Sequence, residues 1–383
     1  GGTARPAPFL ENRHYRLTHD ETRAGIRSII DKETGEELID VRAPFAFDQL
    51  LYQEYSGIAS QDRHRDTAGT AKPVQGATRV DGPTAPAAVE RGELFDVLRW
   101  NAALTAASGA MPRIEQAVRV YHPIKRVELV NRIIGKRPTA TTEGVYLAFP
   151  FRVPGGSWRI ENAGVVWQPF ADLLPGANPN VFSVGRWVSS ENARHFVALA
   201  PLEAPLVEFG EIRSLRLDDV GSYRPRQEHV YAQLLNNFWG TNFPLWQGGD
   251  FTFSWAVTSG KAGEGTTRAA QLGQSVLSPP AATIVEPHRA SLPASGSLLR
   301  VAGVRAVVQA LKRSEDGQEL VVRFRETGGQ TGTLVLKPGL LPFVSAQRAD
   351  ALERPEGPVV PVAEGARFEL RRYQILTLRL KLR

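Results

Sequence analysis

Two neighbouring stretches decide the fold class: residues 114–121 (IEQAVRVY) and 125–134 (KRVELVNRII). In the first stretch Ala117, Val118 and Val120 place apolar side chains on both faces of an extended chain. In the second, every other residue from 127 to 133 points the same way, and one of these is the polar Asn131. The pattern predicts two long antiparallel strands of a large sheet.

Similar patterns extend in both directions from this pair. Residues 14–39 read as short strands joined by tight turns, which is typical of hairpins. Further strands are predicted at residues 94–100, 145–151, 181–188, 196–200, 206–209, 230–235 and 251–257. No predicted strand is followed by a helix of ten or more residues, so the α/β barrel and the doubly wound fold are excluded. The sequence predicts an all-β protein.

A domain boundary is predicted near residue 278. One short helix is expected at residues 266–277, and Ser278-Pro279-Pro280 would end it because proline cannot continue the hydrogen-bond ladder. Beyond it, residues 376–382 alternate leucine with polar side chains, as in a half-buried strand. We therefore expect a large domain at residues 1–278 and a smaller β-domain at 279–383, with a long surface loop at 60–86.

Composition excludes several classes of protein. The net charge is +6, but basic and acidic residues are interspersed, and a nucleic-acid-binding surface would need a clustered patch. The absence of cysteine excludes disulfides, thiolate zinc sites and a cysteine nucleophile. No apolar stretch reaches the roughly 18 residues of a membrane span. We expect a soluble protein, of the bacterial cytoplasmic type, that binds neither nucleic acid nor membrane.

The motifs of metal and catalytic sites are absent from the sequence. The seven histidines form neither HxH nor HExxH, and residues 62–66 (DRHRD) are interpreted as a solvated loop because their arginines would repel a cation. Glycosidases need two opposed carboxylates. Glu208 with Glu211, or Asp218 with Asp219, are formal candidates, but proximity in sequence does not select either pair. We predict no catalytic residue, metal ligand or cofactor on this chain.

The stretch at residues 236–251, NNFWGTNFPLWQGGDF, combines large aromatic side chains with amides. Sugars have apolar ring faces and polar edges, so aromatic platforms with amide donors and acceptors suit them. Asn237, Trp239 and Asn242 are the candidate sugar contacts. A buried aromatic plug beneath a sheet is the alternative, and the residues alone leave both open.

The chain resembles the C-terminal β-region of glycoside hydrolase family 38, the α-mannosidases. The resemblance rests on motifs that run in order along nearly the whole chain. They are residues 12–17 (NRHYRL), 25–28 (GIRS), 31–35 (DKETG), 47–50 (FDQL), 143–151 (EGVYLAFPF), 204–207 (APLV), 236–243 (NNFWGTNF) and 326–329 (ETGG). It implies a large galactose-mutarotase-like β-supersandwich followed by a smaller β-sandwich.

The resemblance also implies what this chain lacks. In the family, zinc and the catalytic carboxylates belong to an N-terminal barrel that is not in this sequence, so we expect no turnover by the chain alone. The barrel and an α-mannoside are the implied partners, and a homo-oligomer is left open. Tyr146 corresponds to a tyrosine that reaches the family's active site, and Arg213 is transferred as an arginine near it. Residues 372–375 (RYQI) depart from the family's Pro-Phe-Glu-Ile, which puts the contacts of the last strand in question.

Two other functions remain as alternatives. The chain is an autonomous carbohydrate-binding module if the aromatic segment binds sugar without a barrel. It is a mutarotase-like isomerase or lyase if a histidine and an acid converge on one sheet face, and the sequence does not identify such a pair.

Overall fold

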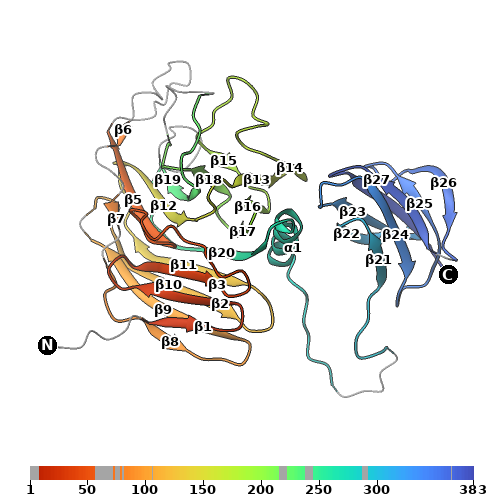
Figure 1. Cartoon of the computed structure of the whole chain (residues 1–383), viewed down its shortest axis with the longest axis horizontal. Coiled ribbons are helices and arrows are strands. Elements are labelled where there is room, and N and C mark those ends of the chain that lie inside the picture. Colours follow the sequence, from red (N-terminus) through yellow and green to blue (C-terminus); the bar gives the residue numbers. More distant parts are fainter. Residues whose placement is uncertain are drawn as a thin grey trace. The chain divides into compact units, whose positions relative to one another are not determined.

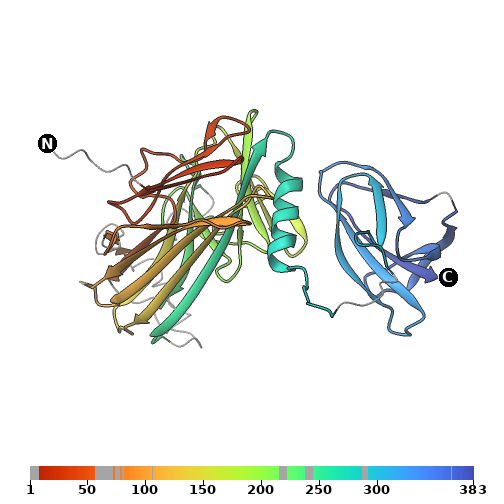
Figure 2. The same ribbon diagram turned by 90° about the horizontal axis from the view of Figure 1, so that it is seen from below.

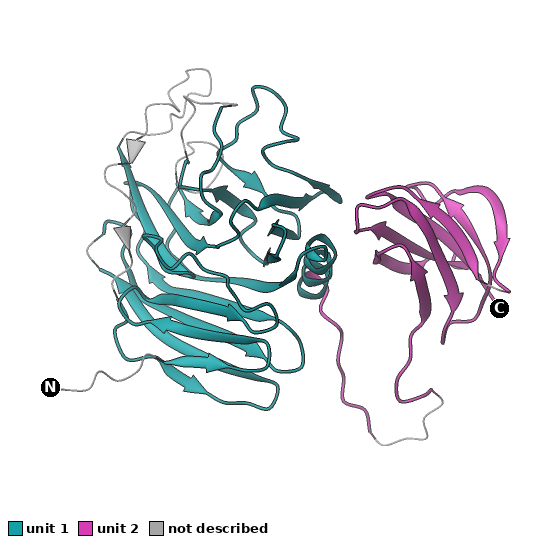
Figure 3. Cartoon of the chain, viewed as in Figure 1, with its two compact units in different colours: residues 1–276 teal, residues 277–383 magenta. Residues whose placement is uncertain are grey.

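The structure, a computed structural model, describes residues 8–56, 72–73, 78–79, 82–105, 107–214, 222–237, 245–286, 292–363 and 365–383. It divides into two compact units, residues 1–276 and 277–383 (Figure 3). Each unit is built almost wholly of antiparallel strands, so the all-β prediction is confirmed (Figure 1). The predicted loop at 60–86 lies largely outside the described residues, as do residues 62–66 and the pair Asp218 and Asp219.

Unit 1 contains three sheets. The four-stranded sheet runs in the order β1 (Phe9–Glu11), β2 (Tyr15–Asp20), β3 (Gly25–Asp31), β4 (Glu36–Glu37). The nine-stranded sheet runs β14 (Val165–Trp167), β13 (Ser157–Asn162), β16 (Trp187–Glu191), β17 (His195–Pro201), β20 (Gly249–Lys261), β11 (Val127–Lys136), β10 (Met111–Tyr121), β9 (Phe95–Leu104), β8 (Ala88–Glu90). The seven-stranded sheet runs β15 (Phe182–Ser183), β18 (Leu206–Phe209), β19 (His229–Asn236), β12 (Thr142–Pro150), β5 (Gln49–Ser56), β6 (Lys72–Pro73), and β7 (Thr78–Arg79) also pairs with β5.

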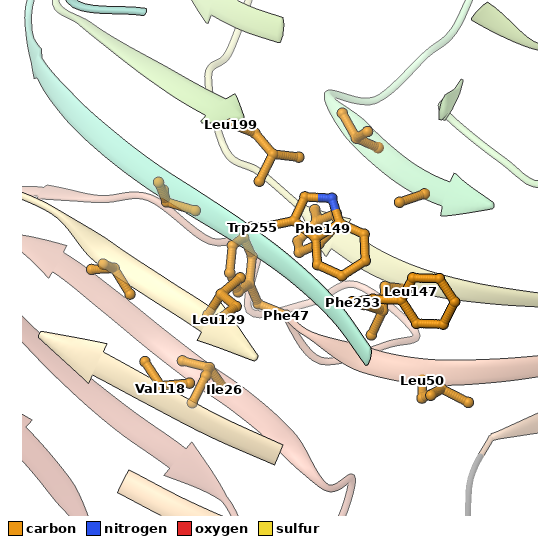
Figure 4. Close-up of a cluster of buried hydrophobic side chains, with 14 of the residues drawn as sticks. Ile26, Phe47, Leu50, Val118, Leu129, Leu147, Phe149, Leu199, Phe253 and Trp255 are labelled. Atoms are coloured by element: carbon orange, nitrogen blue, oxygen red, sulfur yellow. The ribbon is translucent and has the colours of Figure 1, made fainter. Parts of the chain in front are cut away.

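The two stretches that decided the fold class are β10 and β11. They pair antiparallel with Val118 opposite Leu129, as predicted. All three sheets contribute to one hydrophobic core, in which Leu129, Phe149 and Trp255 are buried together (Figure 4). Side chains alternate along a strand, so one face of the seven-stranded sheet packs into this core and the other face points away from it.

A polar network crosses the apolar core at Asn131, the polar residue in the buried face of β11. Its amide donates to Asp48 Oδ1 at 2.8 Å and accepts from Gln116 Nε2 at 2.6 Å. Asp48 is fully buried and adopts a left-handed φ of 61°, and its Oδ2 has no hydrogen-bond partner among the described residues. Burial raises the pKa of Asp48 to about 8, although the bond from Asn131 opposes the shift. Asp48 is therefore mostly protonated at neutral pH.

Helix α1 (Gly265–Leu277) ends unit 1 where the sequence predicted a helix. Figure 2 shows it alongside the strands of unit 1. Ala269, Ala270 and Gly273 are buried, and a side chain at Gly273 would come within 3.1 Å of Trp187, so the helix packs closely on β16. It is too short to cross a membrane, and the described residues contain no other helix.

Unit 2 is a smaller sandwich with its own core. Its three-stranded sheet runs β21 (Leu299–Gly303), β24 (Gly332–Pro338), β27 (Ala366–Leu370). Its five-stranded sheet runs β22 (Ala306–Arg313), β23 (Glu319–Glu326), β28 (Ile375–Leu382), β25 (Phe343–Ala349), β26 (Pro355–Pro361). Phe324, Leu336 and Leu378 are among the buried residues that join the two sheets. The alternating residues 376–382 lie in β28, as predicted.

Glu326, the first residue of the ETGG motif, binds backbone amides from two segments of unit 2. Its buried carboxylate accepts from the backbone amides of Gly328 at 2.6 Å, Gly329 at 3.0 Å and Tyr373 at 2.8 Å. Gly329 needs its glycine because its φ is 67°. At residues 372–375, where the sequence departs from the family, the Tyr373 backbone amide therefore binds Glu326 just before β28.

Candidate functional site

The seven-stranded sheet carries a second, smaller buried cluster on the face opposite the main core. Tyr55 from β5, Tyr146 from β12 and Tyr231 from β19 lie in it, packed with Leu51 and Ala148. Val145, Leu147 and Phe149 of the same β12 point into the main core instead. Strand alternation thus gathers three tyrosines from neighbouring strands on one face.

Glu208 provides a buried acid on this face. It is fully buried on β18, where it accepts from Ser214 Oγ at 2.5 Å and from the backbone amide of Arg213. Ser214 Oγ also accepts from Gln233 Nε2 at 2.9 Å. Burial raises the pKa of Glu208 to about 7, while the Ser214 hydroxyl and the Arg213 amide act to lower it. The carboxyl group therefore changes protonation near neutral pH.

Tyr146 has no exposed surface in this structure. Its hydroxyl lies 2.9 Å from the Tyr55 hydroxyl. Burial, and next the negative charge of Glu208, raise the pKa of Tyr146 well above its ordinary value, so the phenol keeps its proton. We define the tyrosine cluster as Tyr55, Tyr146, Glu208, Arg213 and Ser214.

Arg213 joins the same cluster and is held by protein groups. Its Nε donates to Asn180 Oδ1 at 2.8 Å, and its Nη1 donates to Glu211 Oε1 at 2.7 Å. Its guanidinium carbon lies 3.7 Å from the centre of the Tyr223 ring, within the range of a cation–π contact. Glu208 and Glu211, the formal acid pair of the sequence, therefore contact one arginine between them.

A different polar group lies where the chain passes from β11 in one sheet to β12 in the other. The Lys136 ammonium and the Glu143 carboxylate are buried at 2.5 Å, and the Tyr52 hydroxyl donates to Glu143 at 2.6 Å. Asn237 accepts from the Glu143 amide at 2.6 Å and donates to the Thr141 carbonyl at 2.9 Å. We call Lys136, Glu143, Tyr52 and Asn237 the loop anchor.

The structure thus sorts the five predicted sugar contacts into three groups. Glu208 interacts with both Tyr146 and Arg213: it accepts from the Arg213 backbone amide, and its charge acts to raise the pKa of Tyr146. Asn237 belongs to the loop anchor and uses its side-chain amide on the backbone. Trp239 and Asn242 lie outside the described residues. A sugar contact by any of the five stays a prediction.

The sequence reasoning missed Tyr55 and Ser214 and did not choose Glu208. A usable signal was present for two of them. Glu208 is a charged residue between Val207 and Phe209 in a short apolar strand. Tyr55 shares the alternation of β5 with Leu51, so it had to lie on the same face. Ser214 follows the strand and carried no pattern.

A zinc site and a histidine–acid pair are the other arrangements that could support catalysis. Among the described residues, no three His, Asp or Glu side chains are placed to hold a metal ion, so no zinc site can be built from them. Several histidines lie close to acids, among them His14, whose Nδ1 is 2.8 Å from Glu33 Oε1, and His229 at the start of β19, whose Nε2 is 3.2 Å from Asp40 Oδ2. Burial lowers the pKa of His229 despite the charge of Asp40. His229 is 3% exposed, so its ring has little access to a substrate in this structure.

Part of the chain matches a known protein family. The model of the glycosyl hydrolases family 38 C-terminal beta sandwich domain matches residues 305–378. A search of curated proteins finds no match. Among solved structures, a galactose mutarotase-like protein from Lactobacillus casei has 11% identity and a TM-score of 0.37, covering 66% of this chain and 100% of its own.

Two solved structures from Enterococcus faecalis cover all of this chain. One is a protein in glycosyl hydrolase family 38, and the other is an alpha-mannosidase from strain V583. Each has a TM-score of 0.68 and 15% identity, which shows a shared fold. The chain spans only 45% and 43% of their lengths. The match of residues 305–378 to the model of the family 38 C-terminal beta sandwich domain bears out the family recognised from the sequence motifs.

Proposed function

We propose that this chain is the C-terminal β-region of an α-mannosidase-like glycoside hydrolase, serving as scaffold and as part of the substrate wall. The observation that carries the proposal is the shared fold over the whole chain with an alpha-mannosidase of more than twice its length. Hydrolysis of an α-mannoside is then carried out by a barrel that this chain does not contain. The barrel and the sugar are its proposed partners, and zinc belongs to the barrel.

The tyrosine cluster is the part of the wall that we propose to act next to the sugar. The Tyr146 phenol keeps its proton across the physiological pH range, so it remains a hydrogen-bond donor. The Tyr146 hydroxyl is buried in this chain. Its proposed role is therefore either a contact with the sugar that forms once the barrel is present, or a hydrogen bond that orients the Tyr55 hydroxyl. Arg213 is proposed to fix the shape of this wall through Asn180 and Glu211.

The test is made on the enzyme that contains both the barrel and this chain. Tyr146→Phe removes only the hydroxyl, and we expect it to lower kcat for an aryl α-mannoside while thermal unfolding changes little. Tyr121→Phe is the matched control, because the Tyr121 hydroxyl also makes a side-chain hydrogen bond, to Glu128 at 2.7 Å, but lies in the nine-stranded sheet. Equal kinetics for Tyr146→Phe and the control would remove the tyrosine cluster from the substrate wall.

A further inference from the structure

Trp246 is unusual among the tryptophans that the structure describes. It is 66% exposed, whereas Trp100, Trp158, Trp187 and Trp255 are each 7% exposed or less. A large apolar ring in water forgoes the free energy that burial would supply, about 25 cal/mol per Å². A tryptophan that stays exposed on a well-held backbone is therefore a candidate contact residue.

The backbone beside Trp246 is held by the loop anchor. The Lys136 side chain is fully buried, and its ammonium donates to the Gln247 carbonyl at 3.1 Å, to Glu143 at 2.5 Å and to the Arg137 carbonyl at 3.3 Å. These bonds use all three protons of the ammonium. The residue after Trp246 is thus fixed from inside the protein.

Close packing fixes the next two residues. A side chain at Gly248 would come within 2.8 Å of Pro138, and Gly249 has a φ of 116° that other residues rarely adopt. Gly249 then pairs with Lys136 at the start of β20. Trp246 therefore precedes a rigid strand end.

The same Glu143 holds the chain that leaves β19. The Asn237 backbone amide donates to the Glu143 carbonyl at 3.2 Å, and its side chain bonds the backbone of residues 139, 141 and 143. Gln247 and Asn237, ten residues apart, are thus held on β11 and β12 by the two partners of one ion pair: Lys136 binds Gln247 through its ammonium, and Glu143 binds Asn237 through its backbone. Because the backbone next to Trp246 is already ordered, little further conformational entropy is lost when a ligand stacks on the exposed ring.

We propose that Trp246 is a stacking platform for a pyranose ring, and that the loop anchor presents it. An exposed indole offers an apolar face of the size of a sugar ring. We assign the exposed residues Arg137 and Asp250, next to the paired residues Lys136 and Gly249, as donor and acceptor for the hydroxyls at the ring edge; Asp250 Oδ1 also accepts from the Gly135 backbone amide at 2.8 Å. The choice of a mannoside as ligand rests on the proposed function. The binding itself is a property of this chain without a barrel.

The test measures protection of Trp246 in the whole chain. The purified protein is oxidised with limiting N-bromosuccinimide, with and without methyl α-mannoside, and each tryptophan is followed by peptide mass spectrometry. We expect Trp246 to react before the buried tryptophans, and the sugar to slow its oxidation selectively. Saturation-transfer NMR then gives the affinity, which Trp246→Ala is expected to weaken about tenfold and Trp246→Tyr much less.

The control is Leu174→Ala, which trims another exposed apolar side chain of unit 1, at 76% exposure. It should leave sugar affinity unchanged. Equal affinity of Trp246→Ala and the unaltered chain, or no protection of Trp246 by the sugar, would overturn the proposal. Protection of Trp246 only when the barrel is present would assign the ring to a protein contact and also overturn it. Because no turnover is measured, failure here is separate from failure of the proposed hydrolase function.

Discussion

The tyrosine cluster and the loop anchor are both buried polar groups beside the same seven-stranded sheet, yet they differ in how charge is balanced. In the loop anchor, a lysine and a glutamate neutralise each other at 2.5 Å and the remaining donors are bound. In the tyrosine cluster, Glu208 is bound by a hydroxyl and a backbone amide, and its pKa rises to about 7. The loop anchor is therefore suited to a structural role. The tyrosine cluster is suited to a change in the protonation of Glu208 when its surroundings change.

The largest expected effect is the loss of the ion pair. Lys136→Met removes the positive charge and leaves the buried Glu143 uncompensated, which should cost about 3 to 5 kcal/mol of unfolding free energy. Urea unfolding followed by circular dichroism measures this. Adding Glu143→Gln to Lys136→Met should recover part of the loss, because no unpaired charge is then buried. A loss below about 1 kcal/mol would contradict the structural role of the anchor.

Asp48 extends the comparison of buried acids to the main core. Among the described residues, no cation is paired with its carboxyl group. Its pKa is about 8 in the folded chain and near 3.9 unfolded, so between these values the folded state binds more protons. This group therefore makes stability fall as pH rises from 4 to 8, by about 1.4 kcal/mol per pH unit at most. Asp48→Asn keeps the bond from Asn131 and tolerates the left-handed φ.

We expect Asp48→Asn to be more stable than the unaltered chain at pH 8 and to have a flatter dependence of unfolding free energy on pH. Urea titrations at pH 5 and pH 8 measure both. Parallel pH curves for the two proteins would mean that Asp48 is ionised in the folded state.

Ser214→Ala tests the tyrosine cluster with a smaller change. It removes the hydroxyl that binds Glu208 and accepts from Gln233, and leaving two buried polar groups without this partner should cost about 1 to 3 kcal/mol. It should also raise the pKa of Glu208 further, since the hydroxyl acts to lower it. The carboxylic acid band in the infrared spectrum, followed against pH, reports that shift. A pKa that falls or stays constant would contradict the assigned hydrogen bond.

The smallest stability effect is expected at Trp246. Trp246→Ala alters an exposed side chain, so its unfolding free energy should stay within about 0.5 kcal/mol of the unaltered chain. Thermal and urea unfolding measure this directly. A much larger loss would show that the ring packs against the protein, and would remove it as a free platform.

Local patterns in the sequence predicted the strands and the helix because period-two alternation and proline act over a few residues. β10, β11, β28 and α1 lie where these patterns placed them. The polar groups could not be predicted in this way. Lys136 and Glu143 belong to strands of different sheets, and only the crossing of the chain between those sheets brings them together. Asn131 was visible as a polar residue in an apolar face, but its partner Asp48 is 83 residues away.

The candidate site was predicted only in part, for the same reason. The family motif led to Tyr146, and the structure places it beside Tyr55 and Glu208. The amide of Asn237 suggested a sugar contact by its chemistry, whereas the fold uses it to bind backbone groups of residues 139–143. Chemistry read from one residue type cannot distinguish a contact with ligand from a contact with the chain itself.

We propose that this chain supports catalysis and does not perform it. The most direct measurement is hydrolysis of an aryl α-mannoside by the purified chain, with added zinc and with a chelator. The account predicts no turnover under either condition, because retaining hydrolysis needs carboxylates and a metal that belong to the proposed barrel. Zinc-dependent turnover by the chain alone would contradict it and would require a metal site within these 383 residues.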